Sequence, residues 1–149
     1  MQLLIVIFSI LLLDQVSKAL VQQLMHMERI EIIESILYLT YVENPGAAFG
    51  ILPYRTTVFI VVTLVVVGFI LYYMCHLPSD YRLMRLGLAM QLAGALGNMI
   101  DRIRIGYVID FIQISFWPVF NVADIAIVAG IILFIYSFWK KEICLSTET

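Results

Sequence analysis

Residues 108–124 read VIDFIQISFWPVFNVAD, and apolar chain that could span a membrane lies on both sides of them. Asp110 and Asp124 stand at the two ends of this short apolar and aromatic connection. Burial can raise the pKa of a carboxyl group in such surroundings by several units, and an ionised, unpaired carboxylate there is costly. Two such acids in one connection suggest a shared proton and a hydrolytic reaction.

The composition is that of an integral membrane protein. The chain has 149 residues, of which 62% are apolar and only 13% are charged, whereas about a quarter of a soluble domain is charged. At this length we expect one membrane domain over residues 1–149, acting as a monomer, because each crossing uses about 20 residues. The net charge of −2 and the lack of a dense Lys/Arg run exclude nucleic acid as a partner. Lipid or a membrane-borne peptide is the expected partner.

Apolar runs predict an all-α membrane protein, a bundle of four transmembrane helices at about 2–24, 56–76, 86–100 and 120–139. The first run is too long for a signal-peptide core and has no small-residue cleavage site, so it is expected to be retained. The stretch before the second run contains ILYLTYVEN, which is rich in β-branched and aromatic residues. It predicts a strand in a small β-rich cap outside the membrane.

Basic residues give the orientation. The side with the termini would hold Arg82, Arg85, Lys140 and Lys141, and the opposite side Arg29, Arg55, Arg102 and Arg104. The numbers are equal, but the first four fall in far fewer residues, which favours cytoplasmic termini. Asp110 and Asp124 would then lie at the outer face of the membrane.

Asp14 and Lys18 interrupt the first span and are four residues apart, so they share a helix face and can pair. One interpretation is a buried ion pair that braces the bundle. The other is that Asp14 orders the polar end of an active site.

Two polar segments are further candidates. In NPGAAFG, residues 44–50, Asn44 offers an amide, and small residues such as Gly46 would let a substrate backbone approach closely. The alternative is a plain loop that returns the chain to the membrane. In the third span, Asn98 lies on a polar stripe, near Asp101 or Arg102, that would face the bundle interior, and small residues at every fourth position allow close helix packing.

Asp124 has a purely structural interpretation, because Asn121 three residues earlier resembles a helix N-cap with an acid in the first turn. Asp110 is harder to explain structurally, since VIDFIQI gives it no basic neighbour. Together the two acids fit an aspartic protease, in which one acid activates water and the other, protonated, polarises the scissile carbonyl.

The residues that other catalytic mechanisms need are missing from the sequence or badly placed in it. Ser17 and Lys18 are adjacent on a helix and point apart, and His26 and His76 fall at opposite ends of the bundle. There is no HExxH, paired CxxC or glycine-rich phosphate loop, so we expect no metal and no cofactor. A proton-coupled transporter stays open as a non-enzymatic alternative, although four spans without an internal repeat fit it poorly.

Five blocks resemble bacterial lipoprotein signal peptidase, also called signal peptidase II, and stand in that family's order: LLDQVSK (12–18), ENPGAAFG (43–50), GALGNMIDR (94–102), VIDFI (108–112) and FNVAD (120–124). The resemblance implies an aspartic endopeptidase of the bacterial cytoplasmic (inner) membrane. Such an enzyme cuts signal peptides from lipid-modified prolipoproteins just before the diacylglyceryl cysteine.

The resemblance also implies roles for individual residues. Asp110 and Asp124 would be the catalytic pair, and Asp101 would not be catalytic. Asn44, Asn98, Arg102 and Asn121 would line or brace the site.

Overall fold

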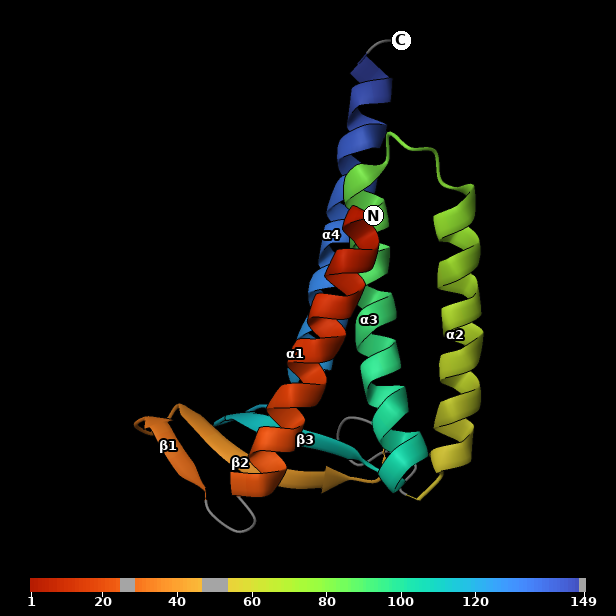
Figure 1. Ribbon diagram of the computed structural model, residues 1–149. Coiled ribbons are helices and arrows are strands. Elements are labelled where there is room, and N and C mark those ends of the chain that lie inside the picture. Colours follow the sequence, from red (N-terminus) through yellow and green to blue (C-terminus); the bar gives the residue numbers. More distant parts are fainter. Residues whose placement is uncertain (25–28, 47–53, 148–149) are drawn as a thin grey trace.

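Four helices form the bundle in the computed structural model, which describes residues 1–24, 29–46 and 54–147, with side chains as far as residue 140. They are α1 (Gln2–Leu24), α2 (Thr56–His76), α3 (Arg82–Ile105) and α4 (Val122–Thr147). All four are long and apolar enough to cross a membrane. Both chain ends lie away from the sheet, which sits at the opposite end of the bundle (Figure 1).

The predicted bounds agree with the structure for α1 and α2 and differ for α3 and α4. The third predicted span covers 86–100, but α3 continues by about a turn at each end. Its C-terminal extension carries Asp101 and Arg102, which find partners in the protein, so the charges do not end the helix. The fourth predicted span covers 120–139, whereas α4 begins at Val122 and runs to Thr147.

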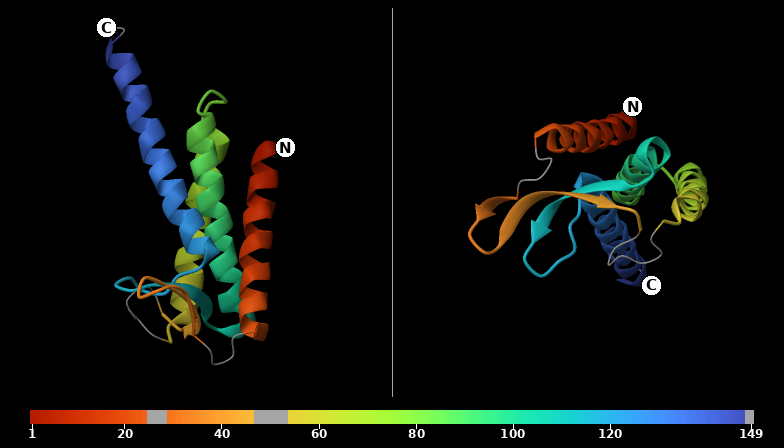
Figure 2. Two further views of the ribbon diagram at one scale, coloured as in Figure 1. Left: turned by 90° about the vertical axis from the view of Figure 1, so that its left-hand side faces the viewer. Right: turned by 90° about the horizontal axis from the view of Figure 1, so that it is seen from below.

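A three-stranded antiparallel sheet forms the predicted cap, in the order β1 (Ile30–Ile33), β2 (Leu37–Asn44) and β3 (Val108–Ile114). The strands β2 and β3 fall in ILYLTYVEN and VIDFIQI, whose sequences are strand-like. The strand β1 was not predicted separately. It pairs with β2 across a tight turn in which Ser35 takes a positive φ of 59°. Seen along the bundle, the sheet extends sideways from beneath the helices (Figure 2).

Helix α3 is the central helix, and α2 is peripheral. Half of the most apolar window of α3 is buried, compared with 6% of that of α2. Most of the surface of α2 is therefore not covered by the other described elements. Glycines allow α3 to approach α4 closely: a Cβ on Gly87 would lie 2.6 Å from the carbonyl oxygen of Gly130, and one on Gly94 would clash with the carbonyl of Ala123.

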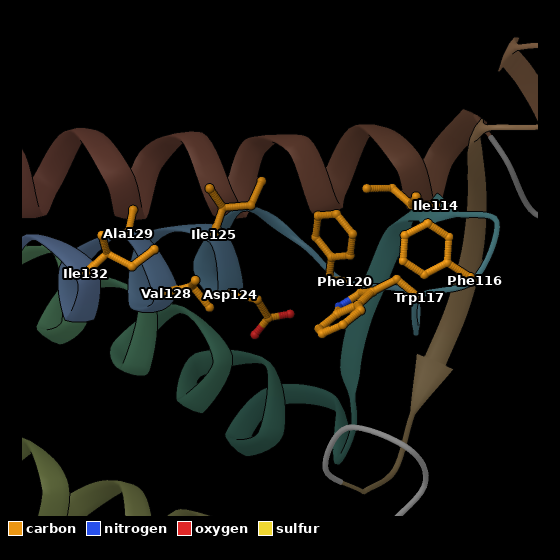
Figure 3. Close-up of a pocket in the computed structure, with 9 residues that line it drawn as sticks. All are labelled: Ile114, Phe116, Trp117, Phe120, Asp124, Ile125, Val128, Ala129 and Ile132. Atoms are coloured by element: carbon orange, nitrogen blue, oxygen red, sulfur yellow. The ribbon is translucent and has the colours of Figure 1, made fainter.

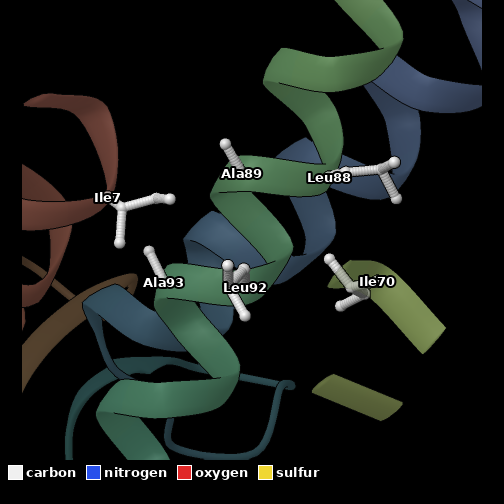
Figure 4. Packing of buried hydrophobic residues seen from close by; sticks show 6 residues of the cluster. All are labelled: Ile7, Ile70, Leu88, Ala89, Leu92 and Ala93. Carbon is white, nitrogen blue, oxygen red and sulfur yellow. The ribbon is translucent and has the colours of Figure 1, made fainter. Parts of the chain in front are cut away.

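The apolar core joins α1, α2 and α3 (Figure 4). It consists of Ile7, Ile70, Leu88, Ala89, Leu92 and Ala93. Along α1 and α3 the polar residues Asp14 and Asn98 follow this cluster in the direction of the sheet. The interior of the bundle is therefore apolar at this cluster and polar where it meets the sheet.

Candidate active site

The connection between Asp110 and Asp124 folds back on itself. The backbone N–H groups of Phe111 and Ile112 donate to the carbonyl of Phe120 at 3.0 and 2.8 Å, and the N–H of Phe120 donates back to Ile112 at 2.9 Å. This bridge brings the start of α4 alongside β3. As a result Asn121 reaches Asp110, although eleven residues separate them in the chain.

Asp110 is buried, with 3% of its surface exposed, and is held by two amides. Asn121 Nδ2 donates to Asp110 Oδ1 at 2.7 Å, and Asn44 Nδ2 donates to Oδ2 at 2.8 Å. Strand β3 supplies Asp110, and Asn44 is the last residue of the neighbouring strand β2. Each oxygen therefore has a neutral donor, and no basic side chain among the described residues forms an ion pair with this acid.

Asp124 sits in the first turn of α4 and is also held by neutral donors. Asn98 Nδ2 donates to its Oδ1 at 2.8 Å, and the backbone N–H of Asn121 donates to its Oδ2 at 3.2 Å. In return, the N–H of Asp124 donates to Asn121 Oδ1 at 3.0 Å. The prediction that Asn121 is the N-cap of α4 is thus confirmed. Asp124, in the first turn, also keeps one oxygen bound to Asn98 of α3.

A second group of acids is paired with Lys18. Its ammonium lies 2.9 Å from Asp14 Oδ2 and 2.8 Å from Asp101 Oδ2, and it donates to Asn98 Oδ1 at 3.0 Å. The predicted ion pair of Asp14 and Lys18 is therefore confirmed, and Asp101 joins it. Asp14 also accepts from the N–H of Ala123 at 2.9 Å, so α1 holds the start of α4 directly.

Two asparagines connect the two groups of acids. Asn98 accepts from Lys18 and donates to Asp124, while Asn121 donates both to Asn98 at 3.1 Å and to Asp110. Asn121 is completely buried. A continuous chain of hydrogen bonds thus runs from Lys18 through two amides to both Asp110 and Asp124.

Asn44, Gly46 and Arg102 lie at the edge of this network. Asn44 Oδ1 accepts from the N–H of Gly46 at 3.0 Å, which orients the amide that holds Asp110. Arg102 Nη2 donates to the carbonyl of Gly46 at 3.1 Å, and its guanidinium lies over the ring of Phe59. The rest of the predicted segment, residues 47–50, lies outside the described residues.

The electrostatics of Asp110 match the sequence prediction for a buried acid. Burial raises its pKa to about 6, the nearby charge of Asp124 adds to this, and the amide hydrogen bonds oppose it. Asp110 therefore changes charge near neutral pH.

An apolar cavity of about 420 Å³ opens beside Asp124 (Figure 3). Ile125, Val128, Ala129 and Ile132 of α4 line one side, and Ile114, Phe116, Trp117 and Phe120 come from the end of β3 and the connection to α4. Asp124 supplies the only acid among these lining residues. One of the two amide-held acids thus borders an apolar cavity.

Sequence reasoning did not single out Gln15, whose side-chain nitrogen bridges three partners. Its amide donates to Asp14 and Asp101, each at 3.1 Å, and to the carbonyl of Gly97 at 3.3 Å. Gly97 is needed there, because a Cβ would lie 2.6 Å from Asp14 Oδ2. A third polar residue beside Asp14 in an apolar span was the available clue.

Known proteins agree with this architecture. Residues 6–140 match the family model for signal peptidase (SPase) II. A lipoprotein signal peptidase of Moorella thermoacetica is 48% identical over 134 residues, covering 89% of each chain. That of Halothermothrix orenii is 47% identical over 139 residues, covering 93% of this chain and 95% of the relative.

Solved structures give the same result. A bacterial membrane enzyme determined by the in meso method at 2.3 Å resolution superposes with a TM-score of 0.89 at 31% identity, covering 95% of this chain and 89% of that one. A second, at 1.9 Å, gives a TM-score of 0.84 at the same identity, covering 92% of each chain. Sequence and fold lead to one conclusion: the chain is a membrane protein that belongs to the signal peptidase II family of peptidases.

Proposed function

We propose that this chain is an aspartic endopeptidase that removes signal peptides from diacylglyceryl-modified prolipoproteins, cutting just before the lipidated cysteine. The observation that carries the proposal is that one residue, Asn121, hydrogen-bonds to two acids without counter-ions among the described side chains, Asp110 and Asp124, and that Asp124 borders an apolar cavity. Lipoprotein signal peptidases are the relatives to which the chain is most plainly similar among those compared.

The chemistry is water activation by a shared proton. One carboxylate takes a proton from a water molecule held between Asp110 and Asp124, and the water attacks the scissile carbonyl. The other acid is protonated and donates to the carbonyl oxygen, which carries the developing negative charge. The amine leaves with a proton returned by the pair. No covalent intermediate and no metal is required, and the proton belongs to the pair rather than to either residue.

The surrounding residues hold the two acids in position. Asn121 and Asn44 fix Asp110, and Asn98 fixes Asp124. Asp14 and Lys18 brace α1 against α3 and α4. Gly46 offers its backbone near the cleavage site, and Arg102 steadies that segment through the Gly46 carbonyl.

The apolar cavity beside Asp124 receives lipid chains of the substrate, which arrives laterally through the membrane. Its lining is aliphatic and aromatic apart from the acid itself, which suits acyl chains and excludes bulk water. The enzyme acts as a monomer in the bacterial cytoplasmic (inner) membrane, with cytoplasmic termini and an outward-facing site. Membrane lipid and the lipidated prolipoprotein are its partners.

The test uses purified protein in lipid vesicles and a synthetic prolipoprotein peptide with a diacylglyceryl cysteine. Mass spectrometry should find one cut, immediately before the lipidated cysteine, and the same peptide without lipid should be cut far more slowly. A chelator should not change the rate; a loss that zinc reverses would point to a metallopeptidase. Proton flux without proteolysis would instead support the transporter alternative.

A further inference from the structure

The end of the bundle opposite the sheet contains a larger cavity, of about 860 Å³. It lies between the first two turns of α1, the end of α2, the connection 77–81 and the first two turns of α3. Most of its wall is aliphatic and includes Val6, Met74 and Leu86. No part of the acid network borders it, so the proposed peptidase reaction leaves this cavity without a role.

Two arginines border this cavity, and no acid does. Arg82 and Arg85 are three residues apart in the first turn of α3 and lie on one side of the helix. No carboxylate among the described side chains forms an ion pair with either guanidinium. The acid of the same connection, Asp80, is exposed and lines a separate cavity of about 360 Å³ with Arg82 and Lys140.

Arg85 also has an unmet hydrogen bond. Its Nε is buried and has no hydrogen-bond partner, and it is the one such side-chain atom found across the described part of the chain. A buried donor without an acceptor is costly, and native proteins rarely leave one. The described residues thus leave the guanidinium of Arg85, which borders the cavity, without a full set of acceptors.

The chemistry of the cavity defines its occupant. A guanidinium binds a phosphate through two parallel hydrogen bonds, and an aliphatic wall accommodates an acyl chain. A zwitterionic headgroup would bring a cation that no lining acid could neutralise. We propose that this cavity binds an anionic phospholipid of the leaflet nearest the chain termini, with Arg85 donating to its phosphate and the α1 to α3 wall holding its acyl chain.

The experiment compares two lipids that have the same acyl chains and different headgroup charges, together with a phosphate that has no acyl chains. Delipidated protein in neutral detergent is titrated with short-chain phosphatidylglycerol, with phosphatidylcholine of the same chains, or with glycerol phosphate. Binding is followed by native mass spectrometry and by the thermal midpoint, which a ligand of the folded state raises. We expect phosphatidylglycerol to bind at least about tenfold more tightly than phosphatidylcholine. Both lipids carry the phosphate, but the arginines repel the choline cation, which no lining acid neutralises.

Two charge variants locate the site. Arg85→Gln should remove the preference for phosphatidylglycerol. Lys140→Gln, which removes one positive charge at the same end of the bundle but outside the cavity, should keep it. Equal binding of both lipids, or an unchanged preference in Arg85→Gln, would overturn the proposal.

Two further results distinguish a lipid site from a site for free phosphate or a general attraction to charge. If glycerol phosphate raises the midpoint as much as phosphatidylglycerol does, the ligand is a free phosphate and the lipid proposal is wrong. Val6→Trp fills the cavity without changing any charge, so it decides the matter even if Arg85→Gln does not fold. We expect it to abolish the preference, and a retained preference would refute the site.

Discussion

Two pairs of acids lie within one hydrogen-bond network, and they differ in the groups that hold their carboxylates. Asp14 and Asp101 share the ammonium of Lys18 at 2.9 and 2.8 Å. Asp110 and Asp124 have no such partner among the described side chains and are held by amides alone. The first pair connects helix to helix, and the second connects the sheet to the start of α4.

The difference indicates what each pair can do. The carboxylates of Asp14 and Asp101 have a counter-ion within the protein. Neutral amides position a carboxyl group without fixing its charge to the same extent, so Asp110 can titrate near neutral pH. One pair therefore stabilises the fold, and the other is available for acid-base chemistry.

The strongest test of this contrast is removal of the amide-held acids. Asp110→Asn and Asp124→Asn should each lower the cleavage rate about 1,000-fold or more, the scale of general acid-base catalysis. The thermal midpoint should change little, because an amide has nearly the same shape. Asp80→Asn, an exposed acid at the other end, serves as the control and should retain full activity. Substantial turnover by either site variant would rule out the pair.

Loss of the shared cation should instead affect stability. Lys18→Met leaves Asp14 and Asp101 buried without a counter-ion, and breaking such a group costs about 3 to 5 kcal/mol. The thermal midpoint of unfolding in detergent should fall sharply. Lys140→Met removes an exposed lysine and should leave the midpoint unchanged. A normal midpoint for Lys18→Met would mean that the Lys18 cluster does not brace the bundle.

A milder change is expected for Asp14→Asn. The amide oxygen can still accept from the N–H of Ala123, while the charge beside Lys18 is lost. Stability should drop by about 1.5 to 3 kcal/mol, typical of a hydrogen bond to a charged group. Thermal midpoints and cleavage rates of the same variant would distinguish a bracing role of Asp14 from a role in the reaction. If the rate vanished while the midpoint held, Asp14 would act in the chemistry rather than in bracing.

The smallest expected effect is a shift in the pH dependence of the cleavage rate. The hydrogen bond from Asn44 holds the pKa of Asp110 down against burial. Asn44→Ala should therefore raise that pKa, so Asp110 keeps its proton to higher pH. The limb of the rate profile on which Asp110 ionises should move upward from about pH 6. Tyr41→Phe, on the same strand but bonded to Glu43, is the control. A downward shift in Asn44→Ala would contradict this electrostatic account.

Much of the fold follows from local sequence. The bounds of α1 and α2 were predicted correctly, because a long apolar run ends there in polar or turn residues. The bounds of α3 could not be predicted in this way. Asp101 and Arg102 look like loop residues until their tertiary partners are known. Asp101 belongs to the helix because Lys18, eighty-three residues earlier, neutralises it.

The site was predictable as a set of residues and not as a set of contacts. Asp110 stood out because nothing nearby in the sequence could neutralise it, and its catalytic role stays a prediction. The hydrogen bonds through Asn98 and Asn121 depend on how α1, α3 and α4 cross, which no spacing encodes. Gln15 was missed for the same reason, since its three partners come together only in the folded bundle.

The backbone bridge between Ile112 and Phe120 has a consequence for how this protein can vary. Because hydrogen bonds on both sides of Phe120 fix the register, the tip between the bridged residues is a short closed loop whose length does not set the spacing of the strand and α4. Extra residues in such a tip cost little closure entropy. The tip can therefore be lengthened or exchanged while the distance between the two acids stays the same.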